Sequence, residues 1–478
     1  MMDLTRSTPG LRSLRQYATP ILLGFVGLGG VAAITALLIL EEVRLAVTLT
    51  ALSVLVAMAM YNIRLAIVGS FVYLTFMGDL RRILLYATDW SGQDPLLLVG
   101  PIIALLLGGY AILSGAIKLD SPIAKLTLAF MAFMTLQIFN PKQGGLMVGI
   151  AGAMLYLVPM LWFWVGRAYA SKGFLNTLFY RVMPVLAGAA ALMGFYQTAY
   201  GYLPYQLEWY RVGGYGALGP REELLRPLSV FPNLTEYVRF LGLVVVFLVA
   251  SVFKGQKKVW PLILFYFLAI FLTGTRGPVA FILLAATIMW TVMGRGIKTW
   301  VPRLALALVV GIAGLFWALP KAGEIQSSSE RIEHVTQRQA NLVESSGGGT
   351  VYIHLNLLYL GFKWGFEEPL GRGIGSTTLA AAKFGSGGGS TEKDISDMFV
   401  AGGVIGGALY LLLVIVVSVS AVRYWMRTRN RLALAIIGFL VFASFGWLKS
   451  GQYVLTPITW FTIGTLDKLY TNSKTDSE

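Results

Sequence analysis

Long apolar runs separated by short polar segments follow one another along most of this 478-residue chain. A run of about 15–25 apolar residues is typical of a helix that crosses a bilayer. The pattern therefore predicts an all-α polytopic membrane protein with about 14 transmembrane helices (12–14, because several runs are short). The predicted spans are residues 20–40, 44–60, 64–78, 96–116, 123–139, 146–165, 182–200, 236–253, 259–273, 278–294, 303–319, 398–422, 432–448 and 455–469.

Basic residues collect in alternate loops of this pattern. If the N-terminus is cytoplasmic, every inward loop carries Lys or Arg, as the positive-inside rule requires. The alternation predicts cytoplasmic tails at residues 1–19 and 470–478. The residues concerned are Arg64, Lys118, Lys125, Arg167, Lys172, Arg181, Lys254, Lys257, Lys258, Arg295, Lys298, Arg303, Arg423, Arg427, Arg429 and Arg431.

Two long polar segments fall on the outward side. One covers residues 201–235, within a membrane domain predicted at 20–319. The other covers 320–397, between the eleventh and twelfth spans, and is followed by C-terminal transmembrane helices at 398–469. Apolar residues at three- and four-residue spacing in 351–366 predict a helix at the membrane surface. Any chemistry is therefore expected on the outer face.

Composition supports a membrane protein and excludes several kinds of site. The chain is 56% hydrophobic with a mean hydropathy of +0.70, more apolar surface than a soluble protein of this length can bury. It has no cysteine and only two histidines, His334 and His354, so a thiolate or multi-histidine metal centre is not expected. The net charge of +15 is explained by cytoplasmic loops and not by nucleic acid. A phosphate-binding GxxxxGK[ST] motif is missing, so an outer-face reaction needs an already activated substrate.

Arg276 lies in "FLTGTRGPVA" (271–280), at the outward boundary between two predicted spans. Gly274 and Gly277 permit a tight turn, and Pro278 suits the first turn of the next helix. The segment therefore places a guanidinium and a helix N-terminus together, and both attract anions. The alternative is that Arg276 reaches lipid phosphate.

A second arginine, Arg226, precedes the span that begins in "FPNLTEYVRF" (231–240). Two arginines that converge on one place suit a pyrophosphate, because guanidinium binds phosphate oxygens in a bidentate manner. Glu236 and Arg239, three residues apart on the following helix, are either functional or a helix-surface salt bridge.

The third group lies in "EEPLGRGIGSTT" (367–378) and "TEKDISDMFVAGG" (391–403). A single Gly-x-Gly-x-Gly is explained either by turns or by a phosphate-binding loop. Glu392, Asp394 and Asp397 precede a span, where carboxylates often cap a helix; alternatively, one of them accepts a proton from a sugar hydroxyl.

Taken in order, these motifs resemble those of the O-antigen ligase and polymerase superfamily, which includes Wzy-type polysaccharide polymerases. "RPLSVFPNLTEYVRFLGL" resembles the family's arginine and Asn-containing start of a span, and "LTGTRGPVAFIL" resembles its Ser/Thr-Arg-Gly turn. "WGFEEPLGRGIGS" and "GGVIGGALYLLL" resemble its Pro-Leu–Gly-x-Gly loop and the Gly-x-Ile-Gly span that follows. The resemblance covers roughly residues 220–415.

The resemblance implies a glycosyltransferase C-like fold in the bacterial inner membrane. It implies transfer of a glycan from a polyprenyl-pyrophosphate carrier to an acceptor hydroxyl at the outer face, without metal, nucleotide or other cofactor. The implied partners are the lipid-linked oligosaccharide donor and acceptor, membrane lipids and a chain-length regulator protein, with no nucleic acid. Arg226 and Arg276 map onto the pyrophosphate-binding pair. The supporting candidates are Arg239, Glu236, Arg338 and Arg372.

One departure from the family pattern affects the function. Ligases of this family carry a histidine about ten residues before the Gly-x-Ile-Gly span, where this chain reads "TEKDISD". His334 and His354 lie well upstream, so the candidate catalytic base is Asp394 or Glu392, or the reaction needs no dedicated base. The departure favours a polymerase of oligosaccharide repeats. An O-antigen ligase or protein O-oligosaccharyltransferase, and a lipid-linked sugar flippase, are the alternatives.

Overall fold

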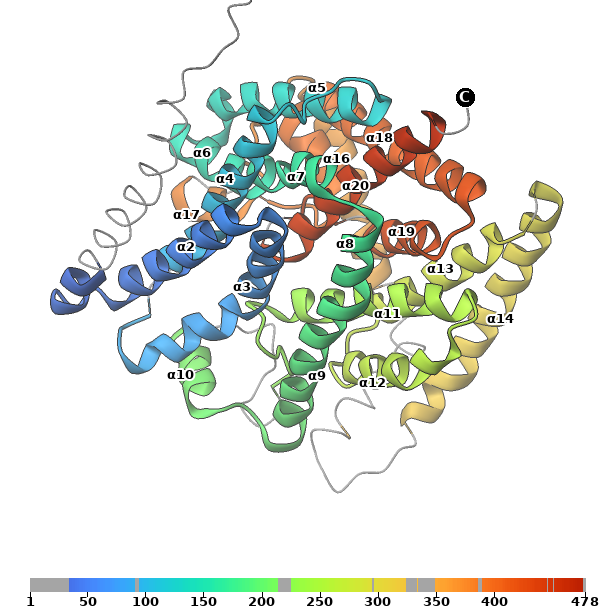
Figure 1. Cartoon of the computed structure of the whole chain (residues 1–478), viewed down its shortest axis with the longest axis horizontal. Helices are drawn as coiled ribbons and strands as arrows, with labels where there is room; N and C mark the ends of the chain where they lie inside the picture. The colour runs from blue at the N-terminus through green and yellow to red at the C-terminus, as the bar shows by residue number, and fades with distance from the viewer. Residues whose placement is uncertain are drawn as a thin grey trace, which may run out of the picture.

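The computed structural model describes residues 34–90, 94–213, 225–294, 296–323, 333, 349–385, 389–444, 446–449 and 451–475. Helices account for 80% of the structure, and the described residues contain no strand. The all-α prediction is therefore confirmed. Figure 1 shows the helices packed around one another, with α2 and α3 at one edge and α14 at the opposite edge. The main helices are α2 (Val43–Tyr61), α3 (Ile63–Ile83), α4 (Val99–Leu113), α5 (Pro122–Leu136), α6 (Leu146–Met160), α7 (Trp162–Tyr169), α8 (Lys172–Thr177), α9 (Met183–Tyr200), α10 (Pro204–Gly213), α11 (Leu234–Phe253), α12 (Trp260–Phe271), α13 (Gly277–Val292), α14 (Ile297–Gly323), α16 (Gly349–Glu367), α17 (Leu379–Phe384), α18 (Asp394–Thr428), α19 (Arg431–Phe442) and α20 (Leu455–Thr475).

Eight helical segments in the described part of the chain are long and apolar enough to cross a membrane. Such segments are typical of a multi-pass membrane protein. The 14 predicted spans are not confirmed, because α13 and α19 are apolar but shorter and the first predicted span lies mostly outside the described residues. The eight segments are Val43–Tyr61, Ile63–Tyr86, Pro95–Leu113, Pro122–Phe139, Leu146–Tyr169, Lys172–Tyr200, Leu234–Phe253 and Asp394–Thr428.

Long-range hydrogen bonds divide the bundle into two ends. At one end, Asp79 N donates to Val230 O and the Asn233 side chain donates to Gly451 O, so the C-terminus of α3 meets the N-termini of α11 and α20. We call this the site end. At the other end, Arg64 Nε donates to Tyr169 O and Trp425 Nε1 donates to Val292 O. Basic loop residues gather at this second end, including Lys254, Arg429 and Arg431.

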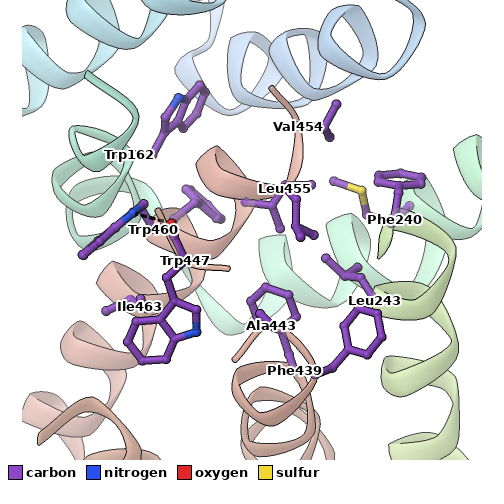
Figure 2. Packing of buried hydrophobic residues seen from close by; sticks show 14 of the residues in the cluster. Trp162, Phe240, Leu243, Phe439, Ala443, Trp447, Val454, Leu455, Trp460 and Ile463 are labelled. Carbon is purple, nitrogen blue, oxygen red and sulfur yellow. Dashed lines mark hydrogen bonds between the residues drawn. The ribbon is translucent and has the colours of Figure 1, made fainter. Parts of the chain in front are cut away.

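The core lies between α7, α11, α19 and α20. Figure 2 shows large apolar side chains from these helices and from the 443–455 segment pointing toward one another. Trp447 and Trp460 are both almost fully buried, and Trp460 Nε1 donates to Trp447 O at 3.0 Å. The apolar sequence of α19 and α20 therefore folds inward and fixes the loop between them against α11.

A break in α18 determines the shape of the site end. Gly403 has φ 63° and ψ −160° inside the helix, so a residue with a side chain is disfavoured there. The break leaves Val400 O and Ala401 O without helical partners, and they accept hydrogen bonds from Arg372 N (2.9 Å) and Gly373 N (3.0 Å). The glycine loop at 371–375 is therefore the cap of a broken helix.

The segment 320–397, which the sequence predicted to be a large outward loop, is partly helical. Helix α16 covers the segment 351–366, where the sequence predicted a helix, and it packs along the first turns of α18. Helix α17 follows the glycine loop. Most of residues 324–348 lie outside the described residues.

Candidate functional site

Asn233 and Glu236 fix the start of α11 to the rest of the site end. The Asn233 side chain accepts from Glu236 N at 2.9 Å and so caps the helix, as an Asn at this position commonly does. The Glu236 carboxylate is fully buried and accepts a hydrogen bond from Val454 N, at the start of α20. Glu236 therefore holds two helix N-termini together, and the structure shows no ion pair between it and Arg239 among the described residues.

The chain around Arg226 is pinned by polar contacts. Ser229 has a left-handed backbone (φ 57°); its N donates to Gln197 Oε1 at 2.7 Å and its hydroxyl donates to Ala190 O at 2.6 Å. Arg82, which is 1% exposed, donates to Ser229 O at 3.2 Å and to Phe231 O. These contacts fix the position of the chain next to Arg226, within the segment that the sequence predicted to be an outward loop.

Arg226 reaches the turn that contains Arg276. Arg226 Nε donates to Thr273 O at 2.9 Å, and the hydroxyl of Tyr202 donates to Arg226 O at 2.6 Å. Arg276 immediately precedes the first residue of α13, so it sits at that helix N-terminus. Two arginine motifs separated by about fifty residues therefore meet at one turn, where guanidinium groups lie next to a helix N-terminus, a combination that binds oxyanions.

Asp394 lies in the first turn of α18 and is 1% exposed. Its Oδ2 accepts from Trp447 N at 2.7 Å and from the hydroxyl of Tyr410. These contacts tie α18 to the loop before α20. They favour a positioning role for Asp394 over the predicted role of a base.

Glu392 lies in a different environment. It has a left-handed backbone (φ 65°), and 49% of its side-chain surface is exposed. Its Oε2 lies 2.9 Å from Nδ1 of His354, on α16. The sequence interpretation set His354 aside because it lies almost forty residues upstream, and the packing of α16 on α18 removes that separation. Nδ1 of His354 has no hydrogen-bond partner among the described residues, so the contact brings a carboxylate and an imidazole together without fixing the ring. A carboxylate next to an imidazole is a common arrangement for a general base.

Three cations lie close enough for their charges to act on one another: Arg239 on α11, Lys393 before α18 and Lys449 before α20. We call them the cationic cluster. Burial, followed by the charge of Arg239, lowers the pKa of both lysines below the usual value, and Lys393 acts on Lys449 in the same direction. Sequence analysis missed both lysines; the signal for Lys449 was a single charge within "FGWLKSGQYV" (445–454), a mostly apolar stretch.

Arg372 belongs to a separate ionic group on the surface. Its Nε donates to Glu368 Oε1 at 2.9 Å, and its guanidinium lies over Trp364. Lys142 Nζ contacts the other Glu368 oxygen at 2.8 Å, and this hydrogen bond holds the Glu368 pKa below its usual range. The Gly-x-Gly-x-Gly loop is likewise occupied, because Ile374 N donates to Gln137 O and Gly375 N to Gln143 Oε1. Of the two alternatives for this loop, turns account for it and a phosphate-binding loop does not.

Two aromatic residues of the 201–235 segment have partners inside the bundle: Tyr205 donates to Asp79 Oδ2 at 2.8 Å, and Trp209 packs against Arg82. Arg338 and His334 lie outside the described residues.

Comparison of the chain with models of known protein families finds no match, and a search of characterised proteins finds none either.

Proposed function

We propose that this chain is an integral membrane glycosyltransferase that polymerises oligosaccharide repeats carried on a polyprenyl pyrophosphate. The observation that carries the proposal is the hydrogen bond from Arg226 to the 273–276 turn, because it joins the two arginine motifs that the family resemblance pairs. In this proposal Arg226 and Arg276 bind the pyrophosphate and stabilise the negative charge that develops on it as the glycosidic bond breaks. The proposed location is the bacterial inner membrane, with the site end facing outward.

The acceptor hydroxyl loses a proton when it attacks the sugar. Of the predicted bases, Glu392 with His354 is favoured over Asp394. The imidazole and carboxylate of the pair are partly exposed, whereas the Asp394 carboxylate is buried and hydrogen-bonded. In the proposed mechanism His354 takes the proton, and Glu392 stabilises the imidazolium.

The same pair supports a second candidate function. The family resemblance associates a histidine near the last motif with ligases, which move a finished glycan to lipid A core or protein. The 2.9 Å contact between His354 and Glu392 is the observation that favours a ligase.

The experiment uses purified full-length protein in liposomes with a synthetic polyprenyl-pyrophosphate oligosaccharide. Chain growth and release of the carrier pyrophosphate are followed by mass spectrometry. We expect growth with the unmodified protein and a loss of about a hundredfold or more in Arg226→Ala and Arg276→Ala, typical of removing a donor to a developing anion. Lys142→Gln, a surface lysine at the same end, is the control and keeps full activity.

Two results would contradict the proposal. Full-length polymer made by either arginine variant would exclude the pyrophosphate role. Transfer of one intact glycan to an added lipid A core or protein acceptor, without growth of the donor itself, would replace the polymerase by the ligase. His354→Ala is expected to slow whichever transfer occurs.

A further inference from the structure

We propose that the cationic cluster of Arg239, Lys393 and Lys449 is an oxyanion site that binds a carboxylate of the glycan substrate. The substrate class would then be an acidic oligosaccharide, such as one that contains a uronic acid. The inference rests on the proposed function, because it assumes that a glycan occupies the site end of the bundle. It adds a specificity-determining contact that the arginine pair does not supply.

The cluster contains a buried donor without an acceptor. Arg239 Nη1 is buried and has no hydrogen-bond partner among the described residues. The structure likewise gives no ion pair or hydrogen bond to the side-chain nitrogens of Lys393 and Lys449 within the described part of the chain. A buried N–H group without a partner is costly, and a charged one more so, because it has lost its hydration without a replacement. Such a group is stabilised when a ligand supplies the acceptor.

The neighbouring carboxylates do not fill this need. Asp397 accepts from Thr391 N at 2.6 Å and from the hydroxyls of Thr391 and Ser390. Asp394 is held by Tyr410 and Trp447, and Oε2 of Glu392 lies 2.9 Å from Nδ1 of His354. The charges of Asp394, Glu392 and Asp397 act on the three cations, but no hydrogen bond or ion pair joins a carboxylate to them among the described residues.

Charge balance favours a carboxylate over a pyrophosphate. The three cations face three carboxylates, so the formal charge of the neighbourhood is near zero and not strongly positive. One sugar carboxylate adds a single negative charge, whereas a pyrophosphate diester adds about two next to Glu392 and Asp397. A planar carboxylate also matches the fork of the Arg239 guanidinium, which donates two parallel hydrogen bonds.

Gly446 packs directly against the Arg239 guanidinium. A Cβ on Gly446 would lie 2.1 Å from Arg239 Nη1, so the loop before α20 closes directly onto the guanidinium. Because Arg239 is long and flexible, a Gly446→Ala substitution is expected to displace the guanidinium without removing its charge. This gives a second way to disturb the site, independent of the lysines.

The test measures binding by isothermal titration calorimetry with purified full-length protein in detergent micelles. The probes are cellobiouronic acid, which carries one carboxylate, its neutral counterpart cellobiose, and inorganic pyrophosphate. We expect the acid to bind at least tenfold more tightly than cellobiose. Lys449→Gln and Gly446→Ala are each expected to weaken binding of the acid about tenfold and to leave cellobiose unchanged. Lys142→Gln is the matched lysine control and changes neither.

Two outcomes would overturn the inference. Equal binding of acid and neutral disaccharide would show that the cluster does not read a carboxylate. Pyrophosphate binding that is lost in Lys449→Gln but kept in Arg226→Ala would assign the cluster to the carrier and not to the glycan. The proposed function can fail separately. If the protein binds the acid but does not extend a lipid-linked glycan, the oxyanion site is supported and the polymerase proposal is contradicted.

Discussion

Two groups concentrate positive charge at the site end. One is Arg44, at the start of α2, with Arg81, near the C-terminus of α3; the other is the cationic cluster. In the first group, Asp94 lies between the arginines: its Oδ2 is 2.5 Å from Arg44 Nη1 and 2.9 Å from Arg81 Nε. Trp90 covers both guanidinium groups. In the cluster the charges of Asp394, Glu392 and Asp397 act on the cations, but no ion pair or hydrogen bond joins a carboxylate to them among the described residues. The comparison teaches that burial of charge alone does not mark a site; what distinguishes the second group is that Arg239 Nη1 is buried without a described hydrogen-bond partner.

The strongest test of this comparison removes the central carboxylate of the paired group. Asp94→Asn leaves two largely buried arginines without a counter-charge, and breaking a buried pair in this way costs about 3–5 kcal/mol of folding free energy. We expect a large fall in thermal stability of the purified protein, with binding of cellobiouronic acid unchanged in the fraction that stays folded. Glu208→Gln removes a carboxylate from an exposed pair with Arg211 and serves as the control. If the Asp94→Asn protein kept its thermal stability, the proposed difference between the paired arginines and the cationic cluster would be contradicted.

The second test closes the break in α18. Gly403 has a positive φ, and a Cβ there would lie 2.0 Å from Pro369 O. Gly403→Ala is expected to destabilise the protein by about 1–3 kcal/mol, because strain and a backbone clash act together. The loss of the glycine-loop cap also moves Lys393 and Asp394, so acid binding and stability should fall together. Gly389→Ala, where a Cβ meets no atom within 4 Å, is the control for stability. Loss of stability without any change in acid binding would show that the glycine-loop cap does not position the cationic cluster.

The third test titrates the cluster. Lys449 faces Arg239 and Lys393, which oppose its charge, and Glu392 and Asp397, which favour it. Its pKa is lowered chiefly by burial, so the unfolded chain binds more protons than the folded chain at pH values between the lowered pKa and the ordinary lysine value of about 10.4. Folding stability should therefore rise with pH in that window.

Binding of the carboxylate has the opposite sign. It requires the ammonium form, so affinity is highest below the lowered pKa of Lys449 and falls as the pH rises through it. Lys449→Gln should flatten both profiles. An affinity for cellobiouronic acid that stays constant from neutral pH to about pH 10 would contradict this role of the lysine.

The smallest effect is expected in the surface group of Lys142, Glu368 and Arg372. The Lys142 side chain is 59% exposed, so its pair with Glu368 is weakened by solvent and contributes at most about 1 kcal/mol. Because the folded pKa of Glu368 is lowered, its contribution is present above the unfolded pKa of about 4.3 and is lost as the pH falls through the folded pKa. Lys142→Gln should reduce this acid-side loss, as measured by thermal unfolding between pH 3 and 6. A much larger change would mean that the paired surface group and the buried groups do not differ as proposed.

Much of the fold followed from local pattern. Apolar runs predicted α2 to α6, α11 and α18 because a helix is the only single segment that satisfies its own backbone in a bilayer. The helix at 351–366 followed from three- and four-residue spacing. The count of 14 did not follow, because an apolar run of a dozen residues serves equally as a core helix or as part of a span, as α12 and α19 illustrate.

By itself the sequence indicated a multi-pass membrane protein and the alternation of basic loops. It also predicted that Arg226 and Arg276 lie close together. Only the tertiary structure decided their neighbours. It brought Arg226 to Thr273, placed His354 beside Glu392, buried Glu236 at the start of α20 and left Arg239 Nη1 without a hydrogen-bond partner among the described residues. The reason is physical: hydropathy is a property of each segment, whereas a hydrogen bond between residues forty to two hundred positions apart depends on how helices pack and where a glycine breaks one of them.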